Sequence, residues 1–165
     1  MLLILTLTLV PAGTAYAAEN ESDHIADAGE MVQVPEKVRE ISEELGEQYC
    51  ICPELLQAMA WQESRFQPDA ENQGCIGIMQ ISKRWHKDRM KRLGVTDLYD
   101  MRQNMTVAAD YIAELAADGE PVEIALMKYH GESGTEEVMA GTREPSEYVT
   151  SILELSTELE RRHGK

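Results

Sequence analysis

The sequence predicts a compact all-α domain that is interrupted by one irregular loop. Apolar residues recur at helical spacing almost everywhere after residue 34, and no repeat or low-complexity tract interrupts them. Only residues 73–82 leave room for a minimal hairpin, because Pro68 and the glycines that follow it break the helical pattern. With 165 residues the chain is long enough for one domain with a real core.

Six helices are predicted, each from an apolar stripe and most with a Pro or Gly boundary. Pro35 and Pro53 stand at permitted early positions of the first two helices, and the second runs to about Phe66. Gly94 and Gly131 end the third and the fifth helix. The apolar stripes are Val34, Val38, Ile41 and Leu45; Leu55, Leu56, Met59 and Phe66; Trp85, Met90 and Leu93, from about Ser82; Met105, Ala108, Ile112 and Leu115; Val122, Ala125, Leu126 and Tyr129; and Tyr148, Ile152, Leu155 and Leu159.

The first 33 residues differ in composition from the rest of the chain. Residues 2–10 form a short apolar run, and small residues follow it before Ala17 and Ala18. Because about nine apolar residues cannot cross a bilayer, the run predicts a secretory signal peptide over residues 1–18, cleaved near its end, rather than a membrane span. No Lys or Arg precedes the run, and a buried N-terminal helix is the alternative.

Residues 19–33 are predicted to be an acidic tether that precedes the folded domain. Residues 19–33 begin with ENESDHIADAGE, which is poor in large apolar side chains and typical of a flexible linker, so the domain is expected over residues 34–165. The formal net charge of the chain is -15. A surface of this sign repels nucleic acid and anionic membranes, so neither is an expected partner. It would also keep an exported protein from sticking to an anionic cell wall.

A carboxylate occupies the apolar stripe of the second predicted helix. Glu63 follows Met59 by four positions and precedes Phe66 by three, so helical spacing places all three on the face expected to be buried. Burial disfavours the charged form of a carboxyl and raises its pKa, which suits a general acid. The alternative is a Glu at the helix end whose carboxylate reaches solvent.

Further polar candidates follow in the loop and in later helices. The stretch GCIGIMQIS contains Gly77, which lets backbone approach a ligand, and Gln80, whose amide suits sugar hydroxyls; an ordinary turn is the alternative. Asn104 stands where the fourth helix is expected to start, and from local sequence an N-cap is its simplest role. Tyr129 lies on an apolar helix face, where most tyrosines are structural.

The three cysteines allow one disulfide in an exported chain. Cys50 and Cys52 are too close in sequence to pair, so one of them is expected to bond to Cys75 and to tie the Glu63 helix to the following loop. We favour Cys52–Cys75, which would enclose about 22 residues and add roughly 3 kcal/mol of stability. The rival is a metal site of these cysteines with His86, but C-x-C is not the usual zinc spacing, and no metal is predicted.

Four blocks of the sequence together resemble a known family. PELLQAMAWQESRFQPDA, GIMQIS, the Asn before AADYIAEL, and IALMKYHG are similar to the lytic transglycosylase domain of the soluble type, which is related to goose-type lysozyme. The resemblance covers essentially all of residues 34–165. It implies a helical lysozyme-like fold and cleavage of the β-1,4 bond between N-acetylmuramic acid and N-acetylglucosamine in peptidoglycan, by a cofactor-free monomer outside the cytoplasm, secreted or associated with a bacterial cell wall.

The same resemblance assigns roles to residues of this chain. It implies that Glu63 is the single catalytic residue, that Ser64 supports it, and that Asn104 helps to shape the groove. Tyr129 matches a tyrosine close to the catalytic carboxyl, and Tyr148, in SEYVTSI, matches one that lines the cleft. The substrate-binding residues expected on this basis are Ser64, Gly77, Met79, Gln80, Asn104, Tyr129, His130 and Tyr148.

The sequence departs from the family pattern in three places. His130 stands where Asn is usual, Asn72 lies near a usual Ser in a slightly shorter loop, and Cys75 replaces a small residue. These changes affect the expected substrate contacts rather than the acid.

Two other functions remain possible from the sequence. A hydrolytic muramidase would need a second carboxylate to activate water. A non-catalytic glycan-binding module would need none. The candidates for a second carboxylate are Asp69, Glu71, Asp97 and Asp100.

Overall fold

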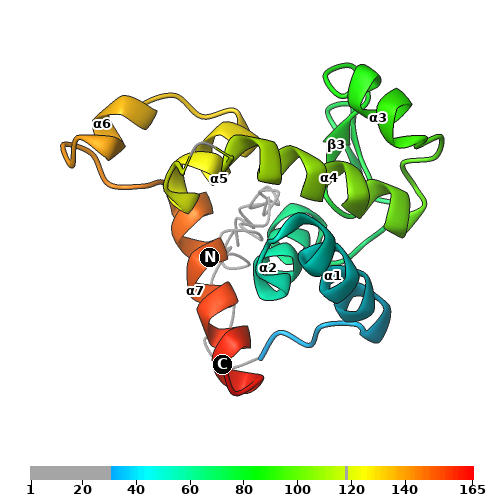
Figure 1. The fold of residues 1–165 in the computed structure, drawn as a ribbon, viewed down its shortest axis with the longest axis horizontal. Coiled ribbons are helices and arrows are strands. Elements are labelled where there is room, and N and C mark those ends of the chain that lie inside the picture. Colours follow the sequence, from blue (N-terminus) through cyan, green and yellow to red (C-terminus); the bar gives the residue numbers. More distant parts are fainter. Residues whose placement is uncertain (1–30, 118) are drawn as a thin grey trace, which may run out of the picture. The chain divides into compact units, whose positions relative to one another are not determined.

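The computed structural model describes residues 31–117 and 119–165, of which Gln33–Lys165 form one compact unit. The predicted signal peptide and most of the predicted linker lie outside these residues. Within the described part there are seven α-helices and one small antiparallel sheet (Figure 1), so the predicted fold class is confirmed. The elements are α1 Glu36–Tyr49, α2 Pro53–Ser64, β1 Glu71–Asn72, β2 Cys75–Ile76, β3 Ile81–Ser82, α3 Lys87–Leu93, α4 Met101–Leu115, α5 Val122–His130, α6 Thr135–Met139 and α7 Glu147–Arg162.

Helix α2 lies at the centre of the compact unit. It packs against α1 and α7, and Figure 1 shows it between them. Leu56, Ala58, Met59 and Ala60 have no exposed surface, and the polar Glu54 and Gln57 are buried with them, so the first two turns of α2 are buried around most of their circumference. This burial holds the last turn of the helix, which contains Glu63, in a fixed position.

Helix α4 supports the opposite side of the core. It packs against α1, α3 and α5, and its fully buried Met105 and Ala108 are on the predicted stripe. Neither α4 nor any other helix in the described part of the chain is both long and apolar enough to span a membrane.

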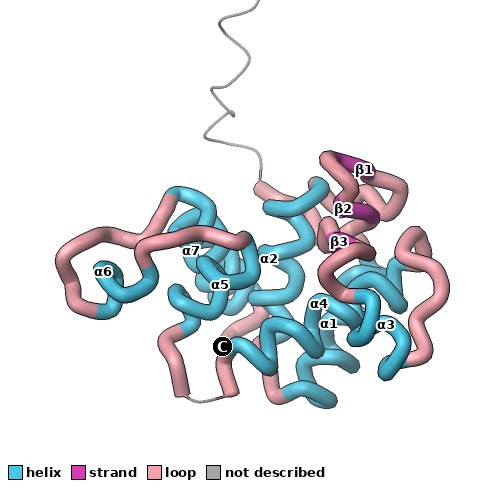
Figure 2. The backbone as a smooth tube through the Cα atoms, turned by 90° about the horizontal axis from the view of Figure 1, so that it is seen from above, coloured by secondary structure: helices cyan, strands magenta, loops and turns pink. Residues whose placement is uncertain are grey.

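The irregular loop after α2 contains the three short strands (Figure 2). β2 pairs with β1 through Asn72 and Cys75, and with β3 through Cys75 and Ser82. Gly77, between β2 and β3, has a φ of +78°, and a Cβ there would lie 2.3 Å from both Asn104 Nδ2 and the Leu98 carbonyl oxygen. Only glycine therefore allows this loop to approach α4 so closely.

Three details of the predicted elements are wrong. The third helix begins at Lys87 rather than near Ser82, because Ser82 pairs in β3 and a turn follows it. The fourth helix begins at Met101, where Asp100 is the N-cap and accepts a hydrogen bond from the Gln103 amide at 2.8 Å. Helix α6 was not expected, since it has five residues and none of them is buried.

The predicted Cys52–Cys75 disulfide is absent: Cys50, Cys52 and Cys75 are all free thiols. Cys52 is the N-cap of α2, whereas Cys75 lies in β2, close enough to Glu63 at the other end of that helix for the Glu63 charge to affect its pKa. A helix of this length separates its two ends by about 18 Å. A disulfide needs Cα atoms within about 7 Å, so this pairing would require the loop to move.

Candidate active site

The Glu63 carboxyl lies in a partly buried position at the end of α2. The Tyr148 hydroxyl, from the first turn of α7, donates a hydrogen bond to Glu63 Oε1 at 2.5 Å. Desolvation raises the pKa of Glu63, and the Tyr148 hydrogen bond and the nearby charge of His130 oppose that rise only in part. The carboxyl therefore holds its proton to a higher pH than an exposed Glu, as a general acid must.

Tyr148 is held in place by a second layer of side chains. Its ring stacks on His130 at a centroid separation of 3.8 Å and an interplanar angle of 5°. His130 Nδ1 lies 2.9 Å from Glu132 Oε1, and the Ser146 hydroxyl donates to the same oxygen at 2.8 Å. Burial and the Glu63 charge raise the pKa of Tyr148, which keeps its hydroxyl protonated as a donor.

Asn104 fixes the loop from within the core. It has no exposed surface, its Oδ1 accepts from the Met79 amide at 2.9 Å, and its Nδ2 donates to the carbonyl oxygens of Ile76 and Leu98, each at 2.8 Å. The N-cap role suggested by local sequence is therefore wrong, because Asp100 caps the helix. Asn104 instead shapes the loop by satisfying three buried backbone groups.

Two residues beside Glu63 fix the same loop from the other side. The Ser64 hydroxyl donates to the Ile78 carbonyl oxygen at 2.8 Å, and the Tyr129 hydroxyl donates to the Met79 carbonyl oxygen at 2.9 Å. Burial, followed by the charge of Glu63, raises the pKa of Tyr129 well above its usual value. The loop is thus positioned relative to Glu63 by side chains from α2, α4 and α5.

The two remaining predicted loop contacts differ in their surroundings. Met79 has no exposed surface, so its side chain packs in the core and only its backbone belongs to the loop framework. Gln80 lines a groove, and its Nε2 donates to the carbonyl oxygens of Gly77 at 2.9 Å and Ala70 at 3.3 Å. With Nε2 used in this way, the amide oxygen is the atom that Gln80 can offer to a ligand.

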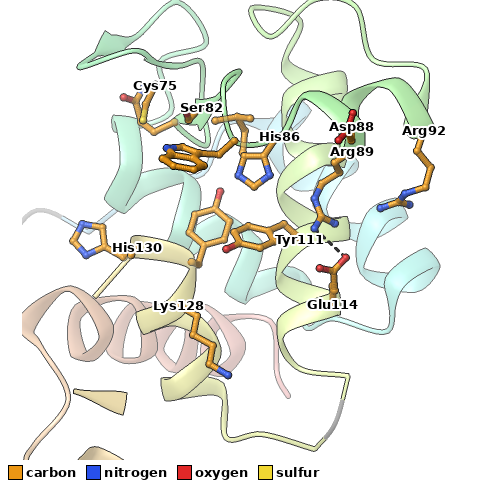
Figure 3. Close-up of a pocket in the computed structure, with 15 residues that line it drawn as sticks. Cys75, Ser82, His86, Asp88, Arg89, Arg92, Tyr111, Glu114, Lys128 and His130 are labelled. Carbon is orange, nitrogen blue, oxygen red and sulfur yellow. Dashed lines mark hydrogen bonds and ion pairs between the residues drawn. The ribbon is translucent and has the colours of Figure 1, made fainter. Parts of the chain in front are cut away.

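The groove has a volume of about 900 Å³ and lies between the β3–α3 segment, α4 and α5. Its wall contains a row of rings: Tyr111 lies 4.7 Å from His86 and 5.5 Å from Tyr129, measured between centroids. Figure 3 shows His86 and Tyr111 directed into the same space, with Arg89 beside them and Cys75 and His130 nearby. Flat ring faces of this kind suit the apolar faces of sugar rings.

Sequence reasoning missed several members of this site. Glu132 bonds to His130, and Ser146 bonds to Glu132. The sequence indicated Glu132 only by its short distance from His130 along the chain, and it gave no indication of Ser146. Cys75, which was expected in a disulfide, instead borders the groove as a thiol, where burial and then the Glu63 charge raise its pKa and keep it protonated. Tyr111 lies on the side of α4 that faces the groove. This position can be recognised only once the arrangement of the helices is known.

The candidates for a second carboxylate have other functions or lie in solvent. Asp97 accepts from the Tyr99 amide at 2.9 Å, and Asp100 caps α4. Asp69 and Glu71 are exposed. Among the residues described, no group of three His, Cys, Asp or Glu side chains is arranged to hold a metal ion, so the alternative cysteine–histidine cluster does not assemble.

Three comparisons with known proteins bear on the family and the fold. The family model described as "Transglycosylase SLT domain" matches residues 40–148. A membrane-bound lytic murein transglycosylase F from Desulfosudis oleivorans is 35% identical over 63 residues, which are 38% of this chain and 13% of that protein. An inactive Glu-to-Gln mutant of the lytic transglycosylase Slt from Pseudomonas aeruginosa has a similar structure, with a TM-score of 0.67 and 17% identity, over 79% of this chain and 25% of that chain.

The structural match shows a shared fold, and the chain spans only a small part of the length of both proteins. The family match covers most of the compact unit, including the Glu63 helix, the loop and Tyr148. The chain therefore belongs to the transglycosylase SLT domain family.

Proposed function

We propose that the domain is a peptidoglycan lytic transglycosylase that cleaves the β-1,4 bond between N-acetylmuramic acid and N-acetylglucosamine. The observation that carries the proposal is Glu63, a carboxyl whose pKa is raised by burial and whose position is fixed by Tyr148. The family membership and the two named lytic transglycosylases support this substrate class. On this proposal the domain acts outside the cytoplasm as a monomer and needs no cofactor.

One carboxyl suffices for the reaction. Neutral Glu63 gives its proton to the glycosidic oxygen while the bond from that oxygen to C1 of the muramic acid breaks and positive charge develops on the sugar ring. The C6 hydroxyl of the same sugar then attacks C1 and gives its proton to the Glu63 carboxylate. The products are a 1,6-anhydro end and a free 4-hydroxyl end, water is not consumed, and Glu63 is neutral again.

The surrounding residues assist this sequence in distinct ways. Tyr148 holds one carboxyl oxygen and stabilises the anion that forms after the first proton transfer. Ser64, Asn104 and Tyr129 hold the loop that ends at Gln80 against the glycan. The row of rings in the groove is suited to stack on the strand.

Replacing the acid tests the proposal. Glu63→Gln should lower the release of soluble muropeptides from purified murein at least about a thousandfold, because one group carries both proton transfers. Its melting temperature should stay near that of the wild type. Retention of a tenth of the activity would rule out Glu63 as the acid, and an inactive wild type would leave the non-catalytic glycan-binding module as the function.

One observation favours a second candidate, hydrolysis. The His130–Glu132 pair adjoins Tyr148, and a carboxylate-bonded imidazole is an arrangement that can take a proton from water. A hydrolytic muramidase using this pair would release reducible muramic acid ends instead of anhydro ends.

A further inference from the structure

Positive charge is concentrated in one short segment of this acidic chain. Residues 83–92 contain six of the 15 Lys and Arg residues and a single acid, Asp88, although the net charge of the whole chain is -15. The segment comprises the turn after β3 and most of α3. The local sign of the surface is therefore opposite to the average.

Two of the six cations are already paired with acids of α4. Arg89 and Arg92 both pair with Asp110 of α4, and Arg89 also bonds to Glu114 at 3.0 Å. The side chain of Arg89 is only 10% exposed. These two arginines attach α3 to α4, and their charge is already compensated.

The other four cations form what we call the basic ridge: Lys83, Arg84, Lys87 and Lys91. All four are exposed, and no salt bridge joins any of them to an acid in the described part of the chain. Lys83, Lys87 and Lys91 border a hollow of about 440 Å³ whose apolar lining includes Met90 and Val95. The guanidinium of Arg84 lies 5.1 Å from the centre of the Trp85 ring, which is 76% exposed.

The ridge adjoins the groove of about 900 Å³, whose lining residues Cys75, Tyr129 and His130 are close enough to Glu63 to interact with it electrostatically. Trp85, His86 and Arg89 line the groove, and they alternate in sequence with ridge residues. Figure 3 shows His86 and Arg89 directed into the groove from α3 and the turn before it. The same segment thus forms the groove wall with one side and presents the ridge with the other, so a polymer that leaves the groove over this wall meets the ridge.

We propose that the basic ridge binds the free carboxylates of the peptide side chains of peptidoglycan, on the same strand whose glycan lies in the groove. This rests on the proposed function for the identity of the strand. Lysine ammonium groups are mobile point charges, which suit carboxylates on flexible peptides. Because the rest of the surface is acidic and repels such a strand, the ridge fixes the side on which the strand lies.

The test measures binding to intact wall. All variants are made in the Glu63→Gln background, so the wall is not digested, and the wall is purified murein stripped of phosphate polymers with hydrofluoric acid. The variant Lys83→Gln/Lys87→Gln/Lys91→Gln is compared with a control that removes the same charge elsewhere, Lys37→Gln/Arg39→Gln/Arg161→Gln. At 50 mM NaCl the ridge variant should bind about tenfold more weakly, the effect of three exposed ion pairs, and the control less than about twofold more weakly.

Two further conditions identify the ligand. At 500 mM NaCl the difference between ridge variant and parent should nearly vanish, because exposed charges are screened. On murein whose carboxyls are amidated with carbodiimide and ammonia, the parent should bind as weakly as the ridge variant does. Thermal melting of the ridge variant at the parent's temperature shows that its fold is intact.

Three results would overturn the proposal. The first is that the ridge variant and the control variant bind murein equally weakly. The second is that the parent binds amidated murein as strongly as untreated murein. The third is that the parent binds only murein that keeps its phosphate polymers. The last would assign the ridge to phosphate. Failure of the proposed function is separate, since it is seen as an inactive wild type and leaves the binding measurements unchanged.

Discussion

At the residue scale, the protonation of Glu63 depends on a balance between burial and two neighbours. Burial raises its pKa, whereas the Tyr148 hydroxyl and the His130 charge stabilise the anion. A single carboxyl that acts first as acid and then as base needs both effects. Burial keeps it protonated before the reaction, and the two neighbours stabilise the carboxylate that later accepts a proton. His130 acts on this site in two ways. Its charge stabilises the Glu63 carboxylate, and its ring stacks on Tyr148 and helps to position the Tyr148 hydroxyl.

Removing the Tyr148 hydroxyl should shift this balance. Tyr148→Phe takes away the hydrogen bond to the carboxylate, so the pKa of Glu63 should rise further. Activity that needs neutral Glu63 is lost as the pH rises through that pKa, and the alkaline limb of the pH–rate profile should therefore move to higher pH. The maximal rate should fall about tenfold or more as anion stabilisation is lost. The profile is measured by release of soluble muropeptides.

Thr150→Val is a suitable control for this profile, because Thr150 lies two residues further along α7 and its hydroxyl bonds only to backbone of its own helix. An unchanged alkaline limb in Tyr148→Phe would show that the hydroxyl does not act on Glu63.

The local sequence pattern singles out Glu63, whereas for Asn104 only the family resemblance implied a role in shaping the groove. Glu63 was identifiable because a polar residue on an apolar stripe is conspicuous in a single helix. Asn104 was assigned as an N-cap because local preference favours that role, yet its partners lie near residues 76, 79 and 98. Such partners become neighbours only in the folded chain, and no local pattern encodes them.

At the element scale, the loop between β2 and β3 depends on Asn104. Asn104→Ala would leave the Met79 amide and the Ile76 and Leu98 carbonyls without their partner. We expect the free energy of unfolding to fall by about 3 kcal/mol, because buried polar groups without partners are costly. Urea denaturation measures this loss.

Activity of the Asn104→Ala protein at a temperature where it is still folded should also fall, since the loop would no longer be fixed beside Glu63. The exposed Gln48 of α1 is the control: Gln48→Ala should cost less than about 1 kcal/mol. Equal stability of the two variants would contradict the role of Asn104.

A second element contact joins the start of α2 to the end of α7. Glu54, whose side chain is 2% exposed, accepts from His163 Nδ1 at 2.7 Å, from Lys165 Nζ at 2.7 Å and from the Cys52 thiol at 3.1 Å. Burial alone would raise the pKa of Glu54, but these hydrogen bonds outweigh it and lower that pKa from 4.5 to about 2. The ionised carboxylate therefore stabilises the fold by about 2–3 kcal/mol.

The sign of this shift gives a pH dependence. The stabilisation is complete above about pH 4.5 and is lost as the pH falls towards about 2. Glu54→Gln should be less stable than the wild type at pH 7, and the difference should shrink through that window. Glu158→Gln, which removes the two ion pairs of Glu158 with Arg161 and Arg162 on α7, should change stability by less than about 1 kcal/mol at any pH. A constant Glu54→Gln difference between pH 7 and pH 2 would exclude the account.

Most elements could be predicted because their signals are local. The five long helices each have an apolar stripe, and of these only α4 begins at a different place from the one expected. The start of α3 could not be predicted, because Ser82 pairs with Cys75 in the sheet instead of beginning the helix. The short helix α6 could not be predicted either, because none of its residues is buried and it therefore has no apolar stripe. The predicted disulfide is wrong for a related reason: Cys52 precedes α2 and Cys75 follows it in β2, so the rigid helix between them holds the two thiols apart.

At the scale of the whole molecule, the average charge is a poor guide to the surface. A net charge of -15 predicts repulsion from an anionic wall, yet four exposed cations adjoin the groove. The composition could not reveal this, because opposite charges far apart cancel in a sum. The family and the helical fold, in contrast, were accessible from the order of the four sequence blocks.

The central claim is that one carboxyl cleaves the glycan without water. Mass spectrometry of the muropeptides released from purified murein by the wild-type domain tests it most directly. We predict that the products end in 1,6-anhydromuramic acid, one water lighter than hydrolysed ends, and that borohydride leaves them unreduced. Reducible muramic acid ends as the main product would contradict the claim and show that the domain is a hydrolytic muramidase.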